Sequence, residues 1–222
     1  MPKEVWVELI KILPSMAWLA VALFFLVRFY PLLTRELLPR LTNLKVFGLE
    51  FTVREVSQKL MEVAKETPTP DSQPLSNEGA NNAAFSAVQN ARYIQGKLVL
   101  IIDDNPRAGA YLYEMISSVG FMAQYAPSSD VAEQILIHFE PHLIVSDIAR
   151  PGFDKEGLEF AQRLRRRGHS IPVLFFISNY DRRAGKPDVA FSITNKPEEL
   201  LFSLVQAAIY IGKSQNNSSS NR

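Results

Sequence analysis

The longest apolar segment of the chain comes near its start. Residues 12–27 are sixteen consecutive uncharged residues, and Lys11 and Arg28 stand directly on either side of them. As a helix this run would span about 24 Å, slightly less than the roughly 30 Å hydrocarbon core of a bilayer, and the two basic side chains can extend to the interfaces. A cleaved signal peptide fits less well because bulky residues and a proline occupy 29–31, and a buried core helix fits poorly because no other segment is comparably apolar. We therefore expect a single membrane span within residues 1–34.

The charges around this run favour one orientation of the span. Two lysines precede it, whereas the basic residues that follow it are Arg28, Arg35, Arg40 and Lys45. Because positive charge gathers on the cytoplasmic side of a span, we expect the C-terminal part of the chain in the cytoplasm. The predicted location is the cell inner membrane or plasma membrane, crossed once.

Residues 35–66 carry two different patterns. Apolar and polar residues alternate around Gly48, which predicts a short strand or hairpin after a helix that ends at Pro39. Further on, an apolar stripe at helical spacing predicts a helix of about two heptads. The stripe consists of Val53, Val56, Leu60 and Val63. A helix this short is only marginally stable in water by itself. It therefore needs a packing partner, either a second copy in a homodimer or the body of the domain that follows.

Two segments have the composition of unstructured chain. Residues 67–96 contain three prolines among the first eight and are rich in Ser, Asn and Ala, which indicates a flexible linker with a short helix within 83–92. Residues 214–222 are polar, and we expect a disordered tail there.

Strand and helix patterns alternate between residues 97 and 213. The predicted strands are 97–102, 121–125, 143–146, 173–177 and 189–193, and the predicted helices are 106–119, 128–139, 156–167 and 198–211. Several of these strands are apolar throughout, as is typical of a parallel sheet covered on both faces. We therefore expect an open α/β domain, in which ligands bind beyond the carboxyl ends of the strands.

Five polar residues follow these strands and should meet at one edge of the sheet. They are Asp103, Asp104, Asp147, Ser178 and Lys196. Three crowded carboxylates repel one another unless a divalent cation neutralises them, and ligation by oxygen atoms suits Mg²⁺. The lysine supplies a positive charge and the serine a hydroxyl donor, which suit a bound phosphoryl group. The pattern predicts phosphoryl transfer onto a carboxylate.

Charge and composition exclude several other classes of protein. The 24 basic and 23 acidic residues nearly balance, so no global field draws the chain to nucleic acid, and the arginines within 163–167 stand at a helix end where cations meet the dipole favourably. The chain has no cysteine, which removes disulfides and thiolate chemistry. His138 and His142 have helical spacing, but Pro141 separates them, so a structural or exposed role is favoured over metal binding.

Four motifs occur together between residues 97 and 213: LVLIIDDN, LIVSDIARP, PVLFFISN and TNKPEEL. This segment resembles the receiver domain of two-component response regulators. The resemblance implies a flavodoxin-like α/β fold with a five-stranded parallel sheet in the order 2-1-3-4-5. It implies that Asp147 is the phosphoacceptor and that Asp103 and Asp104 hold Mg²⁺ with the backbone carbonyl of Ala149. Ser178 and Lys196 would contact the phosphoryl oxygens.

The chain also departs from the family pattern. Ile193 stands where the family often has an aromatic switch residue, and Asn179 replaces a residue that is commonly small. The segment between Ser178 and Lys196 is about one helical turn short, which predicts a short or irregular fourth helix, and the loop 150–157 is about two residues longer than usual. The acceptor chemistry survives these departures, whereas the coupling to an outer surface is left open.

The function that we favour is that of a membrane-anchored receiver. It would accept a phosphoryl group on Asp147 from a histidine kinase or a phosphotransfer protein and signal through contacts with a protein target that the sequence does not name. Enzymatic activity would be limited to self-directed phosphoryl transfer and autodephosphorylation. One alternative is a membrane-tethered scaffold that works independently of phosphorylation. Another, less favoured because no acid or base beyond the acceptor set is evident, is a hydrolase of small phosphates.

Overall fold

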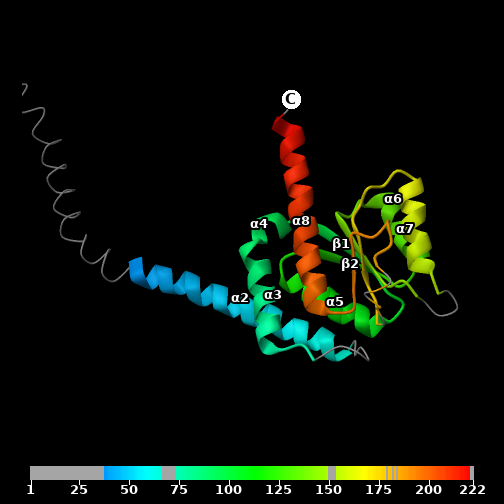
Figure 1. Cartoon of the computed structure of the whole chain (residues 1–222). Coiled ribbons are helices and arrows are strands. Elements are labelled where there is room, and N and C mark those ends of the chain that lie inside the picture. The colour runs from blue at the N-terminus through cyan, green and yellow to red at the C-terminus, as the bar shows by residue number, and fades with distance from the viewer. Residues whose placement is uncertain are drawn as a thin grey trace, which may run out of the picture. The chain divides into compact units, whose positions relative to one another are not determined.

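A computed structural model describes residues 38–66, 74–149, 154–178, 180–181, 183 and 185–220, with the backbone alone for 38–51 and 215–220 (Figure 1). The chain divides into two compact units, residues 1–50 and 51–222. The apolar run 12–27 lies outside the described residues. Among the helices that the structure describes, none is long and apolar enough to cross a membrane.

A five-stranded parallel sheet forms the centre of the second unit, in the order β2-β1-β3-β4-β5. The strands are β1 (Leu98–Ile102), β2 (Met122–Ala126), β3 (Leu143–Ser146), β4 (Val173–Phe176) and β5 (Ser192–Thr194). The three central strands β1, β3 and β4 are buried along nearly their whole length, which explains why they are apolar except for Ser146 at the end of β3. The predicted α/β fold with a five-stranded parallel sheet and its strand order are confirmed.

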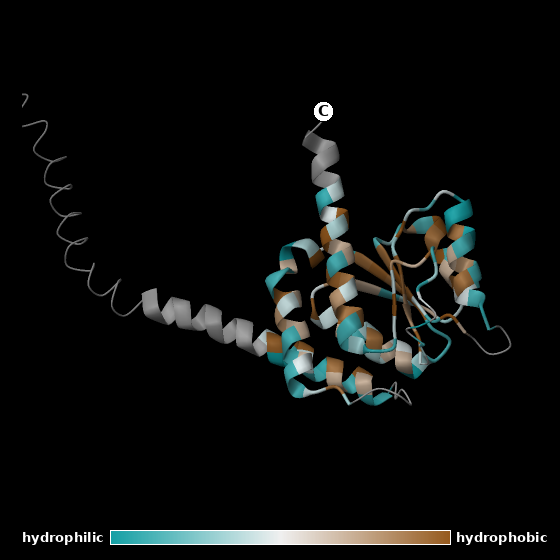
Figure 2. Ribbon diagram, viewed as in Figure 1, coloured by the Kyte–Doolittle hydropathy of each residue, from teal (hydrophilic) through white to brown (hydrophobic). Residues whose placement is uncertain are grey.

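Helices cover both faces of this sheet (Figure 1). They are α5 (Pro106–Ser118), α6 (Ser129–His138), α7 (Glu156–Arg166) and α8 (Pro197–Ser220). Alternate residues of β1 face opposite ways: Val99 and Ile101 pack with α5 and α8, whereas Leu100 and Ile102 pack with α6 and α7. Figure 2 shows the strands as the most apolar part of this unit.

The connection between β4 and β5 has no α-helix among its described residues. This agrees with the missing apolar stripe in that part of the sequence, which predicted a short or irregular helix. The residues that end this connection still reach the core, because Ala190 is buried beside β4 and the Phe191 amide donates to the Val173 carbonyl.

One continuous helix, α2 (Leu38–Glu66), replaces the strand or hairpin predicted around Gly48. The predicted helix end at Pro39 is also wrong, because that proline stands in the first turn, where a missing N–H breaks no helical hydrogen bond. A single glycine costs a helix only about 1 kcal/mol, which the turns on either side can outweigh. The short alternation was therefore a weaker signal than the helical periodicity that follows it.

The apolar stripe of α2 packs within the chain. Val56, Leu60 and Val63 are fully buried in the same core cluster as α5 and α8. Of the two partners that the sequence left open, the domain body is therefore the correct one. The stripe is not available to join two copies in the homodimer that we considered.

Two helices occupy most of the segment predicted to be a flexible linker, α3 (Asn77–Gln89) and α4 (Ala91–Ile94). The side chain of Ser76 caps α3 by accepting from the Gly79 amide. Three fully buried alanines let α3 approach its neighbours closely: Ala80, Ala84 and Ala87. The prediction of a linker over 67–96 is thus wrong for 77–94, where small residues serve packing; residues 67–73 lie outside the described part.

The predicted disordered tail is likewise wrong for residues 214–220, because α8 continues to Ser220. Once a helix has been nucleated by its buried turns, each further residue adds a hydrogen bond at small cost, even where the sequence is polar. The last two residues lie outside the described part of the chain.

Candidate functional site

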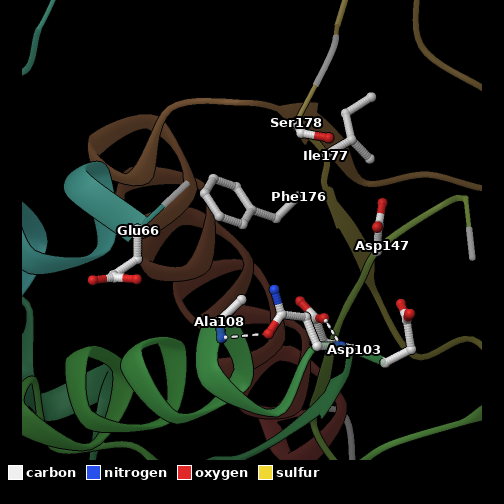
Figure 3. A pocket seen from close by; sticks show the side chains of 9 residues that line it. Glu66, Asp103, Ala108, Asp147, Phe176, Ile177 and Ser178 are labelled. Atoms are coloured by element: carbon white, nitrogen blue, oxygen red, sulfur yellow. Dashed lines mark hydrogen bonds between the residues drawn. The ribbon is translucent and has the colours of Figure 1, made fainter. Parts of the chain in front are cut away.

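A pocket of about 200 Å³ opens at the carboxyl edge of the sheet (Figure 3). Its lining includes four of the five residues that the sequence placed there, namely Asp103, Asp104, Asp147 and Ser178. The remaining lining residues are Glu66, Asn105, Ala108, Phe176 and Ile177. The pocket thus combines a floor of carboxylates with an apolar wall.

Strand register brings the acids together. Ile102 at the end of β1 pairs with Ser146 at the end of β3, so the residues that follow them, Asp103 and Asp147, leave the sheet side by side. A hydrogen bond from the Asp147 amide to the Ile102 carbonyl, 3.2 Å long, holds the two strand ends together. The sequence could predict this meeting because the strand ends follow from the apolar runs.

The first acid pair lies at the N-terminus of α5. The carboxylate of Asp103 accepts a hydrogen bond of 2.8 Å from the Asn105 amide, and its backbone carbonyl accepts one of 2.5 Å from the Tyr125 hydroxyl. Asn105 caps the helix by accepting from the amides of Arg107 and Ala108. The positive end of the helix dipole favours carboxylates at this place.

Asp147 is the acid whose chemistry is most perturbed. Burial raises the pKa of its carboxyl from the usual 3.8 to about 6, and the negative charges of Asp103 and Asp104 act in the same direction. Hydrogen bonds from the backbone amides of Ile148 and Ala149 oppose the rise, the first of them 2.7 Å long. At neutral pH the group is still mostly a carboxylate, although burial and the neighbouring acids disfavour this charged form.

These residues fit a magnesium ion in their chemistry. Three carboxylates and the Ala149 carbonyl are oxygen donors, and a divalent cation would relieve the repulsion that helps to raise the Asp147 pKa. In the described part of the chain, no three acidic, histidine or cysteine side chains are gathered closely enough to hold a metal ion. Mg²⁺ usually keeps several water ligands, so the side chains need not supply its whole coordination shell.

Lys196 is the predicted site residue that the structure does not place in the pocket lining. Its ammonium lies 3.9 Å from the Glu199 carboxylate, and its side chain is 34% exposed. The Lys196 amide donates to the Thr194 hydroxyl, which in turn donates to Glu199 at 2.7 Å. The prediction that all five side chains converge is therefore met by four of them, since a long lysine side chain is not fixed by the end of its strand.

Two residues near the site were missed by the sequence analysis. Glu66 ends α2 and lines the pocket, although it precedes the segment that resembles a receiver. Gly157 lies against the acceptor loop: its amide donates to the Ile148 carbonyl, and a Cβ atom there would come within 1.9 Å of the Asp147 carbonyl oxygen. Only the glycine itself, at the start of a predicted helix, could have signalled this close approach.

Two candidates set aside by the sequence analysis have structural roles. The Nδ1 atom of His142 accepts a hydrogen bond from the Leu98 amide at 3.1 Å. Arg163 and Arg167 both pair with Glu133, each at 3.1 Å. Neither observation points to a metal pair or to a nucleic-acid surface.

Comparison with known proteins agrees with this geometry. Residues 99–189 match the family model of the response regulator receiver domain. The transcriptional activator protein IrlR of Burkholderia pseudomallei is 35% identical over 83 residues, which cover 37% of this chain and 35% of IrlR. The transcriptional regulatory protein TctD of Salmonella typhimurium is 35% identical over 106 residues, 46% of either chain.

Among solved structures, this chain is similar to the response regulator protein TrrA of Thermotoga maritima in complex with Mg²⁺-BeF. The TM-score is 0.45 at 21% sequence identity, and the match covers 50% of this chain and 98% of TrrA. The chain spans less than half the length of IrlR and of TctD. The match to the family model nevertheless covers the strand ends that carry Asp103, Asp104, Asp147 and Ser178. Residues 99–189 of this chain are therefore a response regulator receiver domain.

Proposed function

We propose that this chain is a membrane-anchored receiver that takes a phosphoryl group onto Asp147 from the phosphohistidine of a histidine kinase or a phosphotransfer protein. The observation that carries the proposal is the pocket that gathers Asp103, Asp104, Asp147 and Ser178 at the carboxyl edge of the sheet. Such an edge is where open α/β sheets bind their ligands.

The transfer is a displacement at phosphorus. A carboxylate oxygen of Asp147 forms a P–O bond while the P–N bond of the phosphohistidine breaks, and the bonding pair returns to the imidazole nitrogen. A proton on the other ring nitrogen lets the imidazole leave as a neutral group. Asp147 is suited to the attack because its pKa of about 6 leaves it ionised at neutral pH, yet partly desolvated.

The surrounding residues position the reacting groups. The amides of Ile148 and Ala149 stabilise the Asp147 carboxylate, and the hydroxyl of Ser178 can donate to a phosphoryl oxygen. Mg²⁺ held by Asp103, Asp104, Asp147 and the Ala149 carbonyl would neutralise charge on the transferred group when bound.

The phosphorylated domain would signal through protein contacts. Lys196 would have to leave Glu199 to reach a phosphoryl oxygen. This change of partner would shift the residues at the end of β5 and so alter the neighbouring surface. Hydrolysis of the acyl phosphate would return the domain to its resting state, so its enzymatic activity is limited to its own modification.

The anchor rests on the sequence of the first residues. The apolar run 12–27 and the excess of basic residues after it support a single span in the cell inner membrane or plasma membrane, with the receiver in the cytoplasm. A protease applied to intact cells would then spare the receiver, whereas digestion of the receiver would reverse the proposed topology.

A second candidate function is a scaffold that binds its partner whatever its phosphorylation state. It is favoured by the position of Lys196, which pairs with Glu199 outside the pocket lining, and by Ile193 at the position of the aromatic switch. Both features weaken the link between the pocket and the outer surface.

Incubation with Mg²⁺ and a small phosphodonor, followed by intact mass measurement, separates the two functions. The phosphoacceptor function predicts one added phosphoryl group in the wild type and none in Asp147→Asn. An unmodified wild type would favour the scaffold function, in which Asp147→Asn, Asp104→Ala and Lys196→Ala all bind the partner as the wild type does.

A further inference from the structure

Glu66 adds an acidic residue to the pocket lining from outside the receiver domain. It is the last residue of α2, and it lines the same pocket as Asp103, Asp104 and Asp147 (Figure 3). The match to the receiver family begins only at residue 99. This acid therefore belongs to the preceding segment of the chain.

Glu66 is paired with Arg107, a residue of α5 that is not itself among the residues lining the pocket. The guanidinium of Arg107 lies 2.8 Å from the Glu66 carboxylate, and the two side chains are 72% and 26% exposed. Arg107 stands in the first turn of α5, two residues after the capping residue Asn105. The ion pair thus joins the end of α2 to the first turn of α5, the helix whose start carries the pocket residues Asn105 and Ala108.

The rest of the C-terminal half of α2 is held independently of the pocket. Its apolar stripe is buried in the core, Ser57 donates to Asn81 at 2.7 Å, and Lys59 pairs with Glu114 at 2.7 Å. Glu114 is not among the residues that line the pocket. A change in the pocket can consequently act on the last turn of α2 while the helix as a whole stays docked.

We propose that Glu66 restrains phosphoryl loading and that the Glu66–Arg107 pair couples the state of Asp147 to the last turn of α2. This inference rests on the proposed function. A phosphoryl group on Asp147 brings additional negative charge and strong acceptor oxygens to the pocket, which repel the Glu66 carboxylate and attract the Arg107 guanidinium. Phosphorylation therefore breaks the pair, and the end of α2 loosens.

The two variants of the pair should differ in sign. Because the Glu66 carboxylate repels a negatively charged group in the pocket, removing its charge should strengthen loading. Both side chains are partly in solvent, so we expect roughly a fivefold effect, at the low end of the range for coupled sites. Removal of Arg107 has the opposite sign, because it leaves the Glu66 carboxylate unneutralised at the pocket.

The test uses the full-length chain with Mg²⁺ and beryllofluoride, an analogue of the phosphoryl group. Titration gives the affinity for beryllofluoride, and hydrogen exchange measured by mass spectrometry follows peptides from residues 52–66. Four proteins are compared: the wild type, Glu66→Gln, Arg107→Gln and Glu114→Gln. The last is the matched control, since it breaks an ion pair of the same helix away from the pocket.

We expect Glu66→Gln to bind beryllofluoride about fivefold more tightly, Arg107→Gln to bind it more weakly, and Glu114→Gln to bind it as the wild type does. In the wild type, beryllofluoride should speed exchange at the end of α2, and in Glu66→Gln this response should be lost. Equal affinities in all four proteins, or a Glu114→Gln effect as large as that of Glu66→Gln, would overturn the inference.

Failure of the proposed function gives a different result. If phosphodonor treatment adds no mass to the wild type, Asp147 is not a phosphoacceptor, and both the function and the inference are wrong. If the mass gain is present but exchange at residues 52–66 does not respond, the function stands and only the coupling through Glu66 is wrong.

Discussion

Replacement of Asp147 by Asn should stabilise the folded chain at neutral pH in the absence of Mg²⁺. The carboxylate is partly desolvated and repelled by Asp103 and Asp104, which raises its pKa from 3.8 to about 6. The amide oxygen of Asn can still accept the hydrogen bond from the Ile148 amide, and its NH₂ group can donate to a neighbouring carboxylate. The substitution therefore removes a charge without removing the local hydrogen bonding.

The magnitude follows from the shift in the Asp147 pKa. Roughly two pKa units at 1.36 kcal/mol each give about 3 kcal/mol, and partial solvent screening reduces this to about 2 kcal/mol. Because the raised pKa makes the folded state hold its proton longer than the unfolded state does, the free energy of unfolding of the wild type falls as the pH rises between about 4 and 6. The advantage of Asp147→Asn is therefore small near pH 4 and complete above about pH 6.

Urea denaturation followed by circular dichroism measures this difference at pH 4.5 and pH 7. We expect Asp147→Asn to exceed the wild type by about 2 kcal/mol at pH 7 and by clearly less at pH 4.5, and added Mg²⁺ should stabilise the wild type more than the variant. Equal stability of the two proteins at pH 7, or a difference that does not change between these pH values, would refute the electrostatic reasoning.

Three further outcomes are expected. Gly157→Ala forces a Cβ atom against the Asp147 carbonyl, so it should destabilise the fold by about 1–3 kcal/mol in urea denaturation and slow phosphorylation. In the control Gly79→Ala, the added Cβ atom meets only side chains at 3.3 Å, so the free energy of unfolding should change by less than about 1 kcal/mol. Leu60→Ala should cost about 2–5 kcal/mol without altering the sedimentation velocity of the folded protein, since Leu60 packs within the chain; a shift in oligomeric state would contradict that packing. The full-length chain should sediment with membranes after cell lysis, and deletion of residues 1–34 should release it; recovery of the full-length chain in the soluble fraction would remove the proposed span.

The sheet and most of the site could be predicted from the sequence because burial determines both. Uninterrupted apolar runs mark the central strands, and the end of each run fixes where the next polar side chain emerges. Asp103 and Asp147 follow paired strand ends, so their meeting requires no knowledge of side-chain conformation. The position of Lys196 does require it, because several rotatable bonds separate its backbone from its charge, and Glu199 competes for that charge.

The segment before the receiver was harder to interpret. Its small residues have the composition of a linker, but Ala80, Ala84 and Ala87 are buried, and only a packed partner makes their spacing meaningful. Glu66 could not be assigned to the site for the same reason, since its approach to Arg107 joins residues that are distant in the sequence.

The central claim is that Asp147 is a phosphoacceptor, and intact mass spectrometry tests it most directly. The full-length chain is incubated with Mg²⁺ and a small phosphodonor, alongside Asp147→Asn, and part of each sample is then treated with hydroxylamine, which cleaves acyl phosphates. The account predicts one added phosphoryl group in the wild type, its loss with hydroxylamine and no addition in Asp147→Asn. An unmodified wild type, or a modification that persists in Asp147→Asn, would contradict it.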